Sequence, residues 1–204
     1  GEHLGNAKRL KEVFGRYLVH AKSVVPDSFD LSGMRIVVDC AHGAAYKVAP
    51  IMFNELGAEV FTIGVNPNGT NINDNCGSTS TSNTCQKVLE HRADLGICLD
   101  GDADRVIFID EKGQTLDGDK VIGLFAKLML KNGTLKRGDT VVGTVMTNLG
   151  LEHYLKKLGL NLIRTKVGDR YIVEEMRKIN AVLGGEPSGH IILLNHSTTG
   201  DGTL

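Results

Sequence analysis

The sequence predicts an α/β fold made of two successive βαβ-type domains with mixed, mainly parallel sheets. Short runs rich in β-branched residues alternate along the chain with segments in which apolar residues recur at helical spacing. Several of these runs are apolar at every position, which is typical of strands in a sheet that helices cover on both faces. The same order of elements occurs a second time without a repeat of the residues themselves, and this indicates two domains.

The first series of elements begins with an amphipathic helix, because Leu4, Leu10, Tyr17 and further apolar residues up to Val25 recur at helical spacing. Gly57 ends the next helix, since glycine accepts the left-handed backbone of a helix end. After the first helix the predicted elements are a strand at 34–40, a helix at 48–56, a strand at 58–65, a polar loop at 66–80, a helix at 84–91, and strands at 93–100 and 105–110.

The second series follows a turn at 111–114, and acidic residues at 117 and 119 suit the positive N-terminal end of its first helix. We place the domain boundary near residues 112–118, with domains at 1–115 and 116–204. The predicted elements are a helix from 117 to 130, a strand at 139–147, a helix at 149–158 closed by Gly159, a strand at 160–168, a helix at 171–178, and strands at 181–185 and 190–195.

Composition describes an ordinary globular protein and narrows the class of ligand. Hydrophobic residues make up 41% of the 204 residues and charged residues 23%, with 25 glycines that indicate many tight loops. A formal net charge of -1 argues against a nucleic-acid partner bound by broad neutralisation of phosphates. The expected ligand is therefore small, with no nucleic acid and no membrane among the partners.

Cysteine usage and the absence of long apolar runs favour a cytoplasmic location. Cys40, Cys76, Cys85 and Cys98 form no CxxC pair, so we expect all four to be reduced. Nothing at the start of the chain has the pattern of a signal peptide, and no apolar run approaches the roughly 18 residues of a membrane span.

The stretch DGDADR at 100–105 predicts a site for a divalent metal. Asp100, Asp102 and Asp104 stand two residues apart, so a curled backbone brings their carboxylates together, and Gly101 permits the curl. Oxygen ligands suit Mg²⁺, which tends to share its coordination shell with substrate phosphates. Arg105 adds a positive charge beside the metal, where a phosphate could contact both.

Two other interpretations of this stretch are less favourable. One is an acidic surface turn without a metal, which is disfavoured because the stretch follows an apolar strand, and ligands of open α/β sheets bind at the carboxyl ends of strands. The other is an EF-hand, with Asp100, Asp102, Asp104 and Glu111 at loop positions 1, 3, 5 and 12. That pattern needs glycine where Arg105 stands and helices where the flanks are strand-like.

A second motif, GEPSGH at 185–190, suits the recognition of sugar hydroxyls. A carboxylate accepts hydrogen bonds from neighbouring hydroxyls and a serine donates or accepts, so Glu186 and Ser188 could orient a hexose, with Gly189 and His190 beside them. The alternative is a hairpin turn with incidental polar residues, which the loop alone would favour.

The segment KVGDR at 166–170 joins a strand to a helix. Lys166 and Arg170, with the amides of the helix N-terminus, could hold an anion. The alternative, weighed as equal, is a simple helix start with Asp169 as N-cap. The loop at 39–45 lacks the glycine pattern of a phosphate loop and is interpreted as structural. The loop at 66–73 is interpreted as a turn-rich segment that its side-chain amides brace. The histidines do not have the spacing of zinc ligands.

Taken together, these motifs resemble those of the α-D-phosphohexomutase superfamily over essentially the whole chain. DGDADR resembles the superfamily's Mg²⁺ loop at the end of the second domain, and GEPSGH resembles the sugar-binding loop of the third. The segments 67–78, 166–176 and 197–202 are similar to members that interconvert glucosamine 6-phosphate and glucosamine 1-phosphate in bacterial amino-sugar metabolism. Other members, specific for glucose or mannose phosphates, and a stand-alone binding module are the alternatives.

The resemblance implies an intramolecular phosphotransferase that works through a phosphoserine and a bisphosphorylated sugar. Asp100, Asp102 and Asp104 would bind Mg²⁺ and Arg105 would contact the phosphoserine, while Glu186, Ser188, Gly189 and His190 would bind a hexosamine phosphate. Lys166, Asp169 and Arg170 are active-site candidates by their place in the matched motif. The resemblance also implies a third domain truncated at its end, absent first and fourth domains, and no turnover by this chain alone. Ala103 and Pro187 depart from the usual motifs without removing a ligand.

Overall fold

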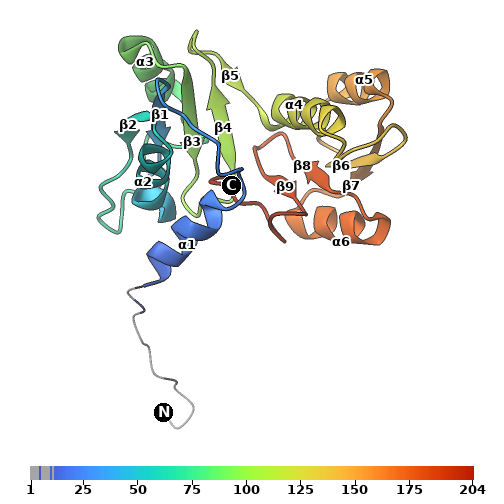
Figure 1. The fold of residues 1–204 in the computed structure, drawn as a ribbon, viewed down its shortest axis with the longest axis horizontal. Helices are drawn as coiled ribbons and strands as arrows, with labels where there is room; N and C mark the ends of the chain where they lie inside the picture. The colour runs from blue at the N-terminus through green and yellow to red at the C-terminus, as the bar shows by residue number, and fades with distance from the viewer. Residues whose placement is uncertain (1–4, 6–9, 11) are drawn as a thin grey trace.

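The computed structural model describes residues 5, 10 and 12–204. Two α/β units lie side by side (Figure 1), the first with helices α1 to α3 around one sheet and the second with α4 to α6 around another. Within these residues, no helix combines the length and apolar character that crossing a bilayer would need. The predicted fold class is confirmed, with parallel and antiparallel pairs in both sheets.

The first sheet has the strand order β2-β1-β3-β4-β5, in which β1 pairs in parallel with β2 and β3, while β4 and β5 are antiparallel additions. Its elements are α1 (Val13–Lys22), β1 (Arg35–Asp39), the short 3-10 helix η1 (Ala44–Tyr46), α2 (Val48–Glu55), β2 (Glu59–Ile63), α3 (Ser82–His91), β3 (Leu95–Leu99), β4 (Val106–Ile109) and β5 (Thr115–Leu116).

Strand β1 shows why its residues are apolar throughout. Ile36 and Val38 face one apolar cluster with residues of α2, while Val37 faces the cluster on the opposite side with Val88 of α3. Because successive strand side chains point to opposite faces, helices on both sides require apolar residues at every position.

The same burial affects the cysteines: all four are free, as predicted, and burial raises the pKa of Cys40 to about 12.

The second sheet has the order β7-β6-β8-β9, with β6 parallel to both neighbours and β8 antiparallel to β9. Val141 of β6 packs with residues of α4 and α5, and Val142 packs with Ile172 and Met176 of α6 on the other face. Its elements are α4 (Gly118–Lys131), β6 (Thr140–Thr144), α5 (Leu149–Leu158), β7 (Asn161–Thr165), α6 (Asp169–Ile179), β8 (Leu183–Gly185) and β9 (Ile191–Leu193).

The structure differs from the sequence predictions in three places. The first helix begins at Val13, and most of the residues before it lie outside the described ones. Strand β5 was not predicted, because its two residues depend on pairing with β4 rather than on a pattern of their own. Asp169 is wrong as an N-cap: Gly168 occupies that position and caps with no side chain, while the Asp169 carboxylate accepts from the Arg170 N–H.

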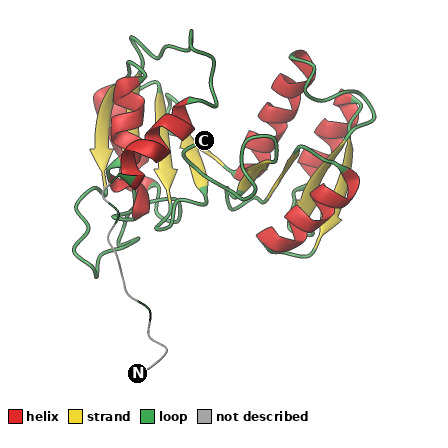
Figure 2. Cartoon of the chain, turned by 60° about the horizontal axis from the view of Figure 1, so that its bottom comes forward, coloured by secondary structure: helices red, strands yellow, loops and turns green. Residues whose placement is uncertain are grey.

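The end of the chain packs against the first unit although it follows the last strand of the second. The Gly202 N–H donates to the Ala103 carbonyl over 2.8 Å, and the Tyr17 hydroxyl of α1 donates to Asp201 Oδ2 over 2.6 Å. Leu204 packs beside Leu18 of α1. Figures 1 and 2 place the C-terminus between the two units, so this segment links them.

Candidate metal centre and the loops around it

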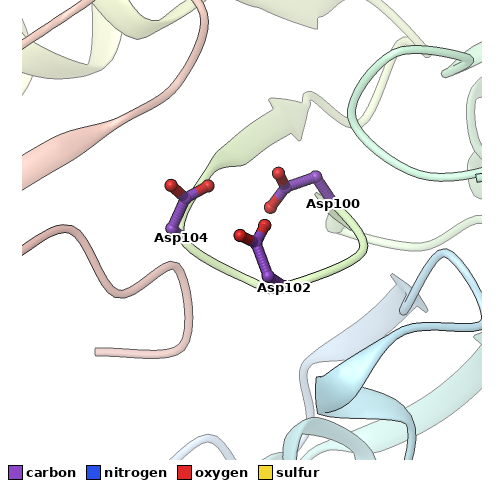
Figure 3. Close-up of side chains that lie close together, drawn as sticks. All are labelled: Asp100, Asp102 and Asp104. Carbon is purple, nitrogen blue, oxygen red and sulfur yellow. The ribbon is translucent and has the colours of Figure 1, made fainter. Parts of the chain in front are cut away.

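The loop between β3 and β4 brings together the three aspartates of DGDADR. Asp100, Asp102 and Asp104 each offer a carboxylate oxygen, and these oxygens lie within 4.8 Å of one another. Figure 3 shows the three side chains along one turn of the loop, with the carboxylates of Asp100 and Asp102 turned toward each other. Ala103, between Asp102 and Asp104, has φ +61°, a left-handed backbone that glycine accepts more easily than alanine.

Arg105 is bound to this loop in the structure. Its Nε lies 2.8 Å and its terminal nitrogen 2.7 Å from Asp100 Oδ2, and its backbone N–H donates to Asp100 Oδ1. Partial burial acts to lower the pKa of Arg105, but the charge of Asp100, with smaller effects of Asp104 and Asp102, raises it overall. The arginine therefore stays charged and holds the buried Asp100 carboxylate in place.

Two other loops of the first unit, those that contain Ala44 and Ser78, hydrogen-bond to the backbone at the start of the metal loop. The Ala44 N–H donates to the Gly101 carbonyl over 2.8 Å, and the Ser78 N–H donates to the Leu99 carbonyl over 2.9 Å. The amides of Ala41, His42 and Gly43 are likewise engaged within the protein, by Asp39, Gly64 and Cys40 respectively. These amides are not free to hold a phosphate, which supports the structural interpretation of the loop at 39–45.

Asp39 organises this support and was not singled out as a site residue from the sequence. Its carboxylate is fully buried at the end of β1 and accepts from the Ala41 N–H at 2.9 Å, the Gly77 N–H at 2.7 Å and the Thr84 hydroxyl at 3.1 Å. A buried acid with three donors from separate segments fixes their relative positions. The only sequence signal for it was a carboxylate at the end of an apolar strand.

The GEPSGH loop connects β8 to β9 and contacts the metal loop. The Val106 N–H, at the start of β4, donates to the Gly189 carbonyl over 3.0 Å. Gly189 has φ +93°, and a Cβ there would overlap the Val106 carbonyl, so the close approach needs glycine. His190 is buried, with its Nδ1 3.3 Å from Asp104 Oδ2. Ser188 is exposed.

Glu186 lies against the start of α6. Its Oε1 accepts from the Gly168 N–H over 3.0 Å, so the carboxylate occupies the position that an anion would take at this helix end. Lys166 and Asp169 are exposed beside it. The exposed Arg170 directs its guanidinium at Glu174 of the same helix, 2.7 Å away, rather than toward Glu186. Glu186 is therefore hydrogen-bonded to the 166–170 segment, but the charged side chains of that segment do not converge on one site.

An apolar cavity of about 260 Å³ adjoins the metal loop. Its lining includes Met34, Phe53, Phe108 and Phe125, and only a minority of the lining residues are charged. Such a lining offers few partners for sugar hydroxyls or a phosphate. Asp104 of the metal loop and Gly189 of the GEPSGH loop also line this cavity, so it adjoins the place where the two loops meet.

The donor set fits a hard divalent cation. All three candidate ligands are carboxylates, and Asp104 Oδ1 is buried without a hydrogen-bond partner among the described residues. Arg105 Nε lies 3.4 Å from this oxygen without donating a hydrogen bond to it, so the oxygen keeps its capacity as a metal ligand. Oxygen-only donors of this kind match Mg²⁺ or Ca²⁺ rather than zinc.

Comparison with known proteins agrees with this arrangement. The family description "Phosphoglucomutase/phosphomannomutase, alpha/beta/alpha domain II" matches residues 15–113, and the corresponding description of domain III matches residues 117–204. Two curated relatives named phosphoglucosamine mutase are 59% and 57% identical to the chain, from Zymomonas mobilis and Parvibaculum lavamentivorans. Each match includes 98% of this chain and 45% of the relative, so the chain spans less than half the length of these relatives.

Solved structures share the fold at low sequence identity. A phosphoglucomutase/phosphomannomutase family protein from Burkholderia thailandensis has a TM-score of 0.80 at 23% identity, with 94% of this chain and 41% of that chain covered. The N-acetylphosphoglucosamine mutase of Aspergillus fumigatus has a TM-score of 0.59 at 22% identity, with 86% and 35% covered. The chain belongs to the phosphoglucomutase/phosphomannomutase family, of which it matches domains II and III.

Proposed function

We propose that this chain supplies the metal-binding and sugar-binding loops of an enzyme that interconverts glucosamine 6-phosphate and glucosamine 1-phosphate. The observation that carries the proposal is the meeting of the two motifs. The hydrogen bond from the Val106 N–H to the Gly189 carbonyl joins the end of the metal loop to the GEPSGH loop, so a ligand at one loop is close to the other. The relatives named phosphoglucosamine mutase support the amino sugar as substrate.

In this proposal Asp100, Asp102 and Asp104 bind Mg²⁺, which when bound stabilises negative charge on phosphate oxygens. Arg105, held at Asp100, is positioned to contact a phosphate beside the metal. Oδ1 of Asp104 is buried and accepts no hydrogen bond from the described residues, although Arg105 Nε lies 3.4 Å away, and this supports a cation here.

Glu186 and Ser188 bind sugar hydroxyls, with Gly189 and His190 beside them. The Gly168 N–H holds one oxygen of Glu186, which leaves its second oxygen available for a hydroxyl. Lys166, Asp169 and Arg170 stay candidate active-site residues; Lys166 and Asp169 are the stronger two, because Arg170 is paired with Glu174.

The remaining parts of the proposal concern the whole enzyme. The phosphoserine that donates the phosphoryl group and the loop that binds the sugar's own phosphate belong to the first and fourth domains. The division that we propose between the two domains here, at 115/116, falls within β5, whose two residues pair with β4 of the first sheet. We expect a cytoplasmic enzyme and no turnover by the 204-residue chain alone.

Binding by this chain tests the proposal directly. Mn²⁺, used in place of Mg²⁺, should bind the wild-type chain weakly, and Asp102→Asn should weaken it at least tenfold, because one of three ligands is lost. With Mg²⁺ present, glucosamine 6-phosphate should shift the NMR signals of Gly168 and Gly189. The proposal would be contradicted if Asp102→Asn bound Mn²⁺ as tightly as the wild-type chain, or if glucosamine 6-phosphate shifted the signal of neither Gly168 nor Gly189.

A second candidate is the same reaction on glucose or mannose phosphates, which the family name favours. Parallel titrations with glucose 6-phosphate and mannose 6-phosphate separate the candidates. The amino sugar should bind most tightly, because the carboxylate of Glu186 attracts an ammonium group as well as hydroxyls. Tighter binding of either neutral sugar would support this second candidate.

A further inference from the structure

One buried polar side chain near the metal loop has no hydrogen-bond role in the fold. The His190 side chain is 4% exposed, and its Nε2 has no hydrogen-bond partner among the described residues. Its Nδ1 lies 3.3 Å from Asp104 Oδ2, across the boundary between the two units. Burial of an imidazole costs free energy unless its nitrogens are used, so this single contact calls for an explanation.

The imidazole is held in place by glycines on two sides. Gly189 brings the backbone before it against Val106 of β4. Gly200 lies against the ring, since a Cβ there would be 2.5 Å from Cε1 and 2.7 Å from Nε2. The ring therefore has little room to rotate, and Nδ1 is directed at Asp104 by packing rather than by a mobile loop.

The two oxygens of Asp104 meet different neighbours. Oδ2 faces His190 Nδ1, while Oδ1 lies 3.4 Å from Arg105 Nε without a hydrogen bond. A donor on Oδ2 fixes the rotation of the carboxylate and so decides where Oδ1 points. Hydrogen-bonded partners of this kind orient metal-binding carboxylates, and their loss typically weakens metal binding by about 10–100-fold.

We propose that His190 is a positioning residue for the metal: from its 3.3 Å contact, Nδ1–H donates to Asp104 Oδ2 when the cation is bound and turns the carboxylate toward the cation. This rests on the proposed metal site at Asp100, Asp102 and Asp104. It adds that a residue of the GEPSGH loop acts on the metal through Asp104, so that the metal loop of one domain and the sugar loop of the other are coupled by one side chain.

The test measures Mn²⁺ affinity of the 204-residue chain by electron paramagnetic resonance with two variants. His190→Asn puts an amide nitrogen where Nδ1 lies, because both are attached to Cγ, whereas His190→Gln puts its amide one bond farther out. We expect His190→Gln to bind Mn²⁺ about tenfold more weakly and His190→Asn to stay within about threefold of wild type. A role in packing alone predicts similar losses in both.

The outcomes separate this inference from the proposed metal site. If Asp102→Asn leaves Mn²⁺ binding unchanged, the metal site itself is wrong. If Asp102→Asn weakens binding but His190→Gln, folded by circular dichroism, binds within about twofold of wild type, the positioning role is wrong; equal losses in the two His190 variants also overturn it.

A measurement on the wild-type chain covers the case in which a variant does not fold. In ¹⁵N-histidine NMR, Nδ1 of His190 should carry a proton, and Mg²⁺ should shift its signal more than it shifts that of His153, which lies on α5 in the second unit. An unprotonated Nδ1, or no shift of its signal with Mg²⁺, would overturn the inference.

Discussion

Replacing Asp39 should destabilise the first unit more than any exposed change near the metal loop. Asp39→Ala leaves the buried N–H groups of Ala41 and Gly77 without an acceptor and removes the partner of the Thr84 hydroxyl. An unsatisfied buried donor costs about 1–3 kcal/mol, so the two amides together give about 2–6 kcal/mol, and we expect about 3–4 kcal/mol after local relaxation.

Urea unfolding followed by circular dichroism measures this loss. With a slope of roughly 1.5 kcal/mol per molar urea, a loss of about 3 kcal/mol lowers the midpoint by about 2 M. Thr84→Val is the matched control, because it removes one hydrogen bond of the same carboxylate and should cost only about 1 kcal/mol. A loss below about 1 kcal/mol for Asp39→Ala would refute the reasoning, since the amides would then not depend on the carboxylate.

Two further predictions concern the second unit. Gly189→Ala should lower the free energy of unfolding by about 1–3 kcal/mol more than Gly138→Ala. Both glycines have a left-handed backbone, but only at Gly189 would the new Cβ overlap the Val106 carbonyl. Equal losses of the two variants in urea unfolding would contradict the overlap. Burial raises the pKa of Asp119 above its ordinary value of 3.8, although the hydrogen bond it accepts from the Asn148 N–H acts in the opposite direction. Folding therefore favours the protonated acid, and the contribution of this one group to stability is lost as pH rises through its raised pKa. Asp119→Asn should remove this contribution, so that the unfolding midpoint of the variant relative to wild type rises with pH above 3.8; a difference that stays constant with pH would contradict it.

Local elements were predictable where local chemistry decides them. Helix α5 runs from Leu149 to Leu158 as predicted, because Asn148 caps its first turn and Gly159 ends it with φ +80°. The alternative with Asp169 as N-cap is wrong, because Gly168 occupies the N-cap position and Asp169 is already the first helical residue. The carboxylate that meets the Gly168 N–H belongs to Glu186, a residue of another loop. A partner so distant along the chain leaves no trace in the spacing of either motif.

The candidate site was predictable in its parts but not in its assembly. The three aspartates converge as their spacing indicated, because a tight turn suffices to gather them. The approach of His190 to Asp104 depends instead on the packing of two separate sheets, and the role of Asp39 depends on donors from three segments. Neither is a property of any stretch of sequence. The expected roles of Lys166, Ser188 and the other sugar-loop residues stay predictions.

The terminal segment at 200–204 affects how relatives of this chain could be recombined. Gly202 and Asp201 follow the second unit in sequence, yet they hydrogen-bond to Ala103 and Tyr17 of the first. A chimera that combines the first unit of one relative with the second unit of another, joined near residue 115, would take this terminal segment from one parent. The surface of the first unit to which the segment binds would come from the other parent. Successful exchange of one unit would therefore require matching the Ala103 loop and the Tyr17 helix to the donor's terminal segment, even though neither lies near the junction.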